Sequence, residues 1–79
     1  MENLTIKTGM HGSLHCFFTF NGQEYCADVS AIPFLDFKTI CSVFRSEGGE
    51  VVDWTPVFTR KDVPVTADGL RECVAAFVS

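Results

Sequence analysis

Residues 13–29 read SLHCFFTFNGQEYCADV and consist of two β-rich runs joined by Asn21-Gly22. An Asn-Gly pair between such runs is typical of a type I′ hairpin turn, because both central residues of that turn need a positive φ. The turn fixes the register of the hairpin. It predicts a mostly apolar face made of the pairs Phe20–Gln23, Phe18–Tyr25, Cys16–Ala27 and Leu14–Val29. It predicts a second, more polar face made of the pairs Thr19–Glu24, Phe17–Cys26 and His15–Asp28.

The segments on either side of this hairpin contain one further strand and one ambiguous element. Residues 3–8 alternate apolar and polar side chains, which predicts a half-buried strand, and residues 9–12 form a turn. After Pro33, apolar residues recur every three or four positions, which predicts an amphipathic helix over residues 34–46. The residues of that stripe are Phe34, Phe37, Ile40, Cys41 and Phe44. The β-branched residues within it leave a strand as the alternative.

The C-terminal third begins with the turn Gly48-Gly49 and a strand over residues 50–54. Residues 57–59 either extend that strand past a bulge at Pro56 or form an edge strand, and residues 60–62 form a polar loop. Thr66 is a good N-cap for a closing helix, and Asp68 suits its first turn. The apolar stripe of that helix consists of Leu70, Cys73, Val74 and Phe77.

These elements predict one α+β domain over residues 1–79, in the order β-β-β-α-β-α. The arrangement that buries every apolar stripe is an antiparallel sheet of four to five strands with both helices packed on one face. The other face of the sheet then stays open to water or to a partner.

The composition narrows the choice of partner and compartment. Asp plus Glu outnumber Lys plus Arg by 10 to 6, which gives a net charge of −4. Direct nucleic-acid binding is not expected, because such proteins usually carry a basic patch. The acidic balance favours a protein partner with a basic surface. With no export signal and no apolar run of membrane-spanning length, we expect a cytoplasmic protein that does not enter membranes.

The four cysteines, Cys16, Cys26, Cys41 and Cys73, contain no closely spaced pair of the kind that zinc sites use. His11, His15 and Cys16 are near one another in sequence, but adjacent strand residues point to opposite faces. We therefore expect reduced, mostly buried thiols and neither metal nor cofactor. An even number of cysteines would allow two disulfides in a secreted chain.

Catalytic chemistry has two weak candidates, both on the polar face of the hairpin. His15 lies opposite Asp28, which could orient and charge the imidazole, but no nucleophile is placed beside them. Cys26 is the only cysteine predicted off the core face, and no ionic group is fixed next to it. Gly48-Gly49 is not followed by the Lys-Ser/Thr of a phosphate-binding loop. We therefore do not expect an enzyme.

Exposed aromatic and acidic side chains mark the predicted contact surface. Phe17 is the aromatic residue on the polar face of the hairpin, and exposed aromatics are favoured anchors of interfaces. Trp54, beside Pro56, either serves the same purpose or closes the end of the core. With the nearby acidic residues, the predicted partner-binding residues are Phe17, Glu24, Glu47, Glu50, Asp53 and Trp54.

The leading functional hypothesis is a small acidic, non-catalytic protein-binding module. Complete chains of this size and charge are often inhibitors encoded by phages or mobile elements, of the antirestriction or anti-CRISPR type. Such an inhibitor would block a host nucleoprotein complex by protein–protein contact in the host cytoplasm. One alternative is a redox or metal-binding protein, or an enzyme, that uses the cysteines and histidines. Another is a structural subunit of an obligate oligomer; monomer and homodimer both remain open.

Overall fold

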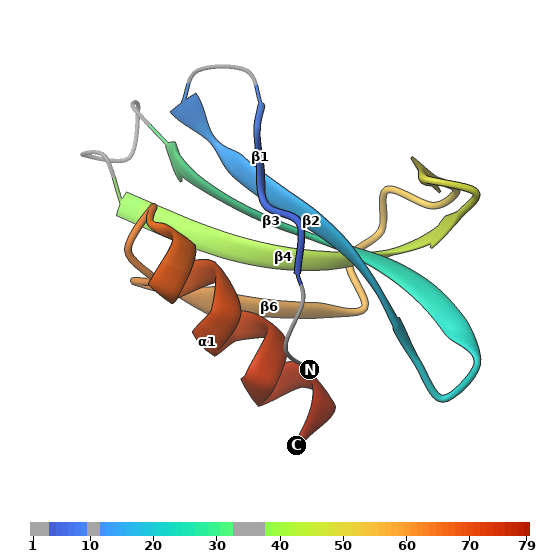
Figure 1. The fold of residues 1–79 in the computed structure, drawn as a ribbon. Coiled ribbons are helices and arrows are strands. Elements are labelled where there is room, and N and C mark those ends of the chain that lie inside the picture. Colours follow the sequence, from blue (N-terminus) through green and yellow to red (C-terminus); the bar gives the residue numbers. More distant parts are fainter. Residues whose placement is uncertain (1–3, 10–11, 33–37) are drawn as a thin grey trace.

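The computed structural model describes residues 4–9, 12–32 and 38–79. The chain folds as an α+β protein in which six strands precede one C-terminal helix (Figure 1). The strands are β1 (Lys7–Thr8), β2 (Leu14–Phe20), β3 (Gln23–Ile32), β4 (Lys38–Glu47), β5 (Glu50–Val51) and β6 (Phe58–Lys61). The helix is α1 (Ala67–Val78), the only α-helix in the part of the chain that the structure describes.

The predicted hairpin is confirmed as β2 and β3. All seven predicted residue pairs are present, from Leu14 opposite Val29 to Phe20 opposite Gln23. Asn21 and Gly22 have φ values of 52° and 78°, as a type I′ turn requires. The hairpin therefore has the predicted division into a core face and a second face.

The helix predicted over residues 34–46 is wrong for the described part of that range, because residues 38–47 form β4. Residues 33–37, including Phe34 and Phe37, lie outside the described residues. β4 pairs with β3 along eight residues, and it buries Cys41 and Val43 in the core. A spacing of four residues, as between Ile40 and Phe44, brings side chains to one face of a strand as well as of a helix. The β-branched residues of the segment favour the strand.

Three smaller boundaries also differ from the sequence prediction. Residues 4–8 are the described part of the strand predicted over residues 3–8, and of these only Lys7 and Thr8 pair with β2. The strand predicted over residues 50–54 ends at Val51. The alternative of an edge strand near residues 57–59 is confirmed by β6, but β6 continues through Arg60 and Lys61, which were expected in a loop.

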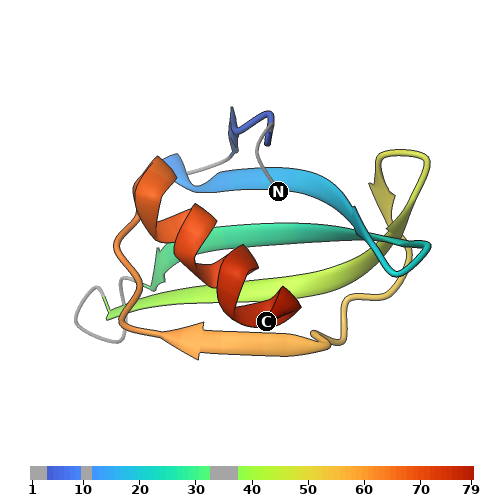
Figure 2. The same ribbon diagram turned by 60° about the horizontal axis from the view of Figure 1, so that its bottom comes forward.

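The sheet is antiparallel and curls into a half-barrel in which β1, β2, β3, β4 and β6 lie side by side, while β5 pairs with the far end of β4. Figure 2 shows α1 lying across one face of this sheet. The prediction of four to five strands is confirmed, but one helix, not two, covers the core face of the described structure. No described helix is long and apolar enough to cross a membrane.

α1 begins as its sequence predicts. The Thr66 side chain accepts a hydrogen bond from the Gly69 amide at 3.0 Å, and Asp68 lies in the first turn. Leu70, Cys73 and Val74 are buried against the sheet. At the last turn, the Phe77 ring meets four other rings, at centroid distances of 4.9 to 6.0 Å: those of Phe18, Phe20, Tyr25 and Phe58.

Candidate functional site

The sheet face opposite α1 is the candidate functional site, and we refer to it as the open face. Alternation along the strands assigns residues to it: Cys16, Ala27 and Val43 are buried on the α1 side, so their sequence neighbours point the other way. The residues so placed on its three longest strands are His15, Phe17 and Thr19 of β2, Glu24, Cys26, Asp28 and Ser30 of β3, and Ile40, Ser42, Phe44 and Ser46 of β4.

An apolar row crosses the middle of the open face. Phe17 pairs with Cys26, and Cys26 pairs with Phe44. Cys26 is only 5% exposed although it does not belong to the core cluster under α1. The prediction that Phe17 and Cys26 lie on this face is confirmed, whereas Phe44 was expected in a helix.

Trp54 extends this row beyond β4. Its ring lies 5.3 Å from that of Phe44, at an interplanar angle of 62°. The indole remains 73% exposed, so the alternative in which Trp54 closes the end of the core is wrong. We call Phe17, Phe44 and Trp54 the aromatic row; the buried Cys26 lies between Phe17 and Phe44. Val52 and Val57, which are 50% and 46% exposed, flank Trp54 in the chain and were not anticipated from the sequence.

The predicted acidic residues gather at the end of the sheet where the β2–β3 turn lies. Glu24 pairs with Thr19 beside that turn, and Glu47 pairs with Glu50 across the tight turn between β4 and β5. All three glutamates are exposed. Repulsion between Glu47 and Glu50 costs little at an exposed site, and it leaves a local excess of negative charge for a partner to neutralise.

Asp53 is held in place by its own contacts. Its carboxylate accepts hydrogen bonds from the Thr55 amide at 2.9 Å and from the Arg45 guanidinium at 3.0 Å. These two contacts, the amide first, hold the pKa of Asp53 below its usual range. Asp53 therefore fixes the loop that carries Trp54, and its charge is largely balanced by Arg45.

The predicted His15–Asp28 pair is present at the opposite end of the face. The two residues are directly opposite in the β2–β3 ladder, and the His15 ring also meets Phe17 edge-on, with 5.9 Å between centroids. Burial raises the pKa of Asp28, and the nearby His15 opposes this shift. Asp28 is thus a half-buried carboxyl group whose ionised form is poorly solvated.

The cysteines lie in two environments. Cys16 and Cys41 of the sheet and Cys73 of α1 are fully buried in the core between the sheet and the helix. Burial raises the pKa of Cys26 to about 11, aided by the charge of Asp28, so this thiol is protonated near neutral pH. No group of three metal-ligating side chains occurs among residues 4–9, 12–32 and 38–79; His11 lies outside this set.

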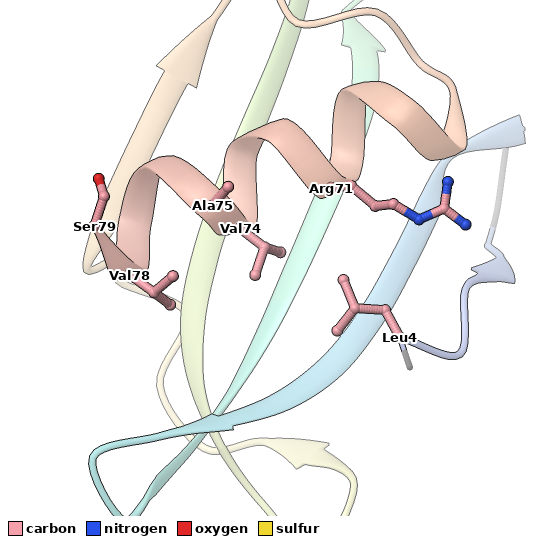
Figure 3. A pocket seen from close by; sticks show the side chains of 6 residues that line it. All are labelled: Leu4, Arg71, Val74, Ala75, Val78 and Ser79. Carbon is pink, nitrogen blue, oxygen red and sulfur yellow. The ribbon is translucent and has the colours of Figure 1, made fainter. Parts of the chain in front are cut away.

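A shallow groove of about 210 Å³ lies on the helix side of the molecule (Figure 3). It is lined by Leu4, Arg71, Val74, Ala75, Val78 and Ser79. Its one charged side chain, Arg71, is exposed and bonds to Asp68 at 3.2 Å. This groove offers apolar contact but no convergent polar groups, so it is a weaker candidate than the open face.

Comparison with known proteins finds no matching family model, no similar curated protein and no similar solved structure.

Proposed function

We propose that the chain is a non-catalytic module that binds another protein through the open face of its sheet. The observation that carries this proposal is the position of Trp54, which is 73% exposed and rests against Phe44 at the edge of the face. Leaving a large aromatic surface in water is unfavourable, and exposed apolar patches on soluble proteins often mark interaction sites. Tryptophan is also among the residues most enriched in binding hot spots.

The charges around Trp54 support a partner with a basic surface. Glu24, Glu47 and Glu50 are exposed at the same end of the sheet, and the chain as a whole has a net charge of −4. Carboxylates at the rim of an interface increase the rate of encounter with a basic partner more than they increase the final affinity. The aromatic row would then supply most of the affinity.

A nucleic-acid-binding machine is the class of target that this combination favours. Such machines carry basic surfaces for phosphate groups, and a small acidic protein docked on one would block access. We therefore retain, as part of the proposal, an inhibitor of the anti-CRISPR or antirestriction type that acts by contact alone.

The experiment is affinity capture from a bacterial lysate with four immobilised baits: the native chain, Phe17→Ala, Trp54→Ala and the helix-side control Arg71→Ala. We expect one host protein to be retained by the native chain and by Arg71→Ala, and to be strongly depleted with both open-face variants. Equal recovery on all four baits would contradict the use of this face. Circular dichroism of each bait excludes unfolding as the cause of a loss.

A second measurement examines the acidic end separately. In the double variant Glu47→Lys/Glu50→Lys, the association rate with the captured protein should fall about tenfold or more at low salt, and its dependence on salt should weaken. An unchanged association rate would show that these carboxylates do not face the partner.

A further inference from the structure

β5 and β6 are two parts of one edge strand that is interrupted by an insertion. Ser46 of β4 pairs with Val51 of β5, and Val43 of β4 pairs with Phe58 of β6. Two residues of β4 lie between these pairs, whereas six residues, 52–57, connect β5 to β6. The edge therefore carries four more residues than the strand with which it pairs, where an ordinary β-bulge adds only one.

Hydrogen bonds close this insertion at both ends. The Val52 amide donates to the Arg45 carbonyl at 3.0 Å, and the Val57 amide donates to the Val43 carbonyl at 2.8 Å. Arg45 and Val43 are two positions apart, so their carbonyls point to the same edge of β4. Residues 53–56, which read DWTP, leave the sheet between these bonds, and we call them the edge loop. Figure 1 shows the chain bending away from the sheet between β5 and β6.

The Asp53 carboxylate ties the edge loop together and to β4. One of its oxygens accepts a hydrogen bond from the Thr55 amide at 2.9 Å, and the other accepts one from the Arg45 guanidinium at 3.0 Å. Trp54 lies between Asp53 and Thr55 in the chain, and its ring meets that of Phe44 at 5.3 Å. The indole is therefore 73% exposed although the backbone on both sides of it is held.

We infer that Arg45 and Asp53 are positioning residues that hold Trp54 in its exposed position before any partner is bound. Their side chains are 51% and 41% exposed, and ion pairs of this kind add little to the stability of a fold. Their effect is local, because a loop that is ordered in advance loses less conformational entropy on binding. The inference rests on the proposed function for the use that is made of Trp54, but the order of the edge loop is a property of the free chain.

The test is NMR relaxation of the free chain, which reports motion on the nanosecond timescale. Trp54 is the only tryptophan, so its indole N–H gives a single signal. At the Trp54 and Thr55 amides of the native chain we expect an order parameter of about 0.85, which is typical of a rigid backbone. A native value closer to about 0.6, the value of a flexible segment, would overturn the inference.

Three variants identify the contacts that hold the edge loop. In Asp53→Ala, which loses both contacts, the order parameters should fall to about 0.6 or lower, and Arg45→Ala should lower them less. Asp53→Asn keeps an oxygen for the Thr55 amide and should recover part of the order. The matched control is Asp68→Ala, which removes the exposed ion pair with Arg71 on α1 and should leave the edge loop unchanged. Native order in both Asp53→Ala and Arg45→Ala would overturn the inference.

A second measurement connects the edge loop to binding of the protein captured from the lysate. Asp53→Ala should raise the dissociation constant about threefold to tenfold in the native background and should have no further effect in the Trp54→Ala background. Equal losses in both backgrounds would mean that Asp53 contacts the partner directly, which would contradict a positioning role. If the lysate yields no partner, the proposed function fails, while NMR relaxation of the free chain still decides this inference.

Discussion

Phe44 and Trp54 meet edge to face on the side of the sheet that α1 does not cover, with 5.3 Å between their ring centroids. Phe44 pairs with Cys26 in the ladder, and Trp54 lies in the irregular segment after β5. This contact continues the row that starts at Phe17, and it leaves most of the indole exposed. The contact matters for function because Phe44, which was expected on the buried stripe of a helix, instead supports Trp54, a predicted partner-binding residue.

The Cys26 thiol and the His15 imidazole should not be required for activity. Burial raises the pKa of Cys26 to about 11, so little thiolate exists near neutral pH. We expect Cys26→Ser and, separately, His15→Ala to change the dissociation constant for the captured partner by less than about threefold. Calorimetric titration of the two variants provides the measurement. Complete loss of activity in either folded variant would instead favour a redox protein or an enzyme.

Replacing Phe77 should destabilise the fold, because its ring joins α1 to β2, β3 and β6. It meets four other rings and lies at the margin of the core cluster. We expect Phe77→Ala to lower the free energy of unfolding by about 3 kcal/mol, toward the lower end for such a truncation because the ring is only half-buried. Urea unfolding measures this change. The exposed helix residue Glu72 offers a control, and Glu72→Ala should change stability by less than about 0.5 kcal/mol.

Gly69→Ala should destabilise the protein, although alanine is normally the better helix former by about 1 kcal/mol. A Cβ atom at Gly69 would overlap the carbonyl oxygen of Pro64 and approach the Val63 side chain. Relieving that overlap requires α1 to move away from the preceding loop, at a cost of about 1–3 kcal/mol. Thermal unfolding followed by circular dichroism will show a lowered midpoint. A raised midpoint would mean that the helix start is less tightly packed than described.

Asp28 should make the protein less stable as the pH rises. Its pKa is raised in the folded state above the unfolded value of 3.8, so the folded state holds this proton more tightly. Stability attributable to Asp28 is therefore greatest below pH 3.8 and declines as the pH rises through its raised folded pKa. We expect Asp28→Asn to remove this decline and to be at least as stable as the native chain at pH 7. Urea unfolding of both proteins at several pH values between 3 and 7 measures the pH dependence of the free energy of unfolding. If the native chain gained stability relative to Asp28→Asn as the pH rises, the raised pKa of Asp28 would be contradicted.

The sequence was most informative where a local motif determines the backbone. Asn21-Gly22 predicted the type of turn, and the turn determines which residues of β2 and β3 pair. That register puts Phe17, Glu24 and Cys26 on the open face. Thr66 likewise predicted the start of α1, because its side chain accepts a hydrogen bond from the amide of Gly69, only three positions away. These features depend on neighbours in the chain, so sequence patterns are sufficient to predict them.

The site was predicted less completely because two of its elements depend on contacts distant in sequence. Phe44 reaches the open face only because β4 pairs with β3, and its four-residue spacing from Ile40 suits a helix equally well. Val52 and Val57 lie in the irregular segment between β5 and β6, where no periodic pattern in the sequence indicates which side chains are exposed. The β-branched residues of 38–47 were the one local signal that pointed to the strand.

The most direct test of the open face as the binding surface is a calorimetric titration of the captured partner with Trp54→Ala. We predict a loss of about 2 kcal/mol or more in binding free energy, equivalent to roughly thirtyfold in the dissociation constant, with unfolding stability lowered by about 1 kcal/mol or less. An affinity within twofold of the native value, while Arg71→Ala or another helix-side variant abolishes binding, would contradict the account and place the interface on the α1 side.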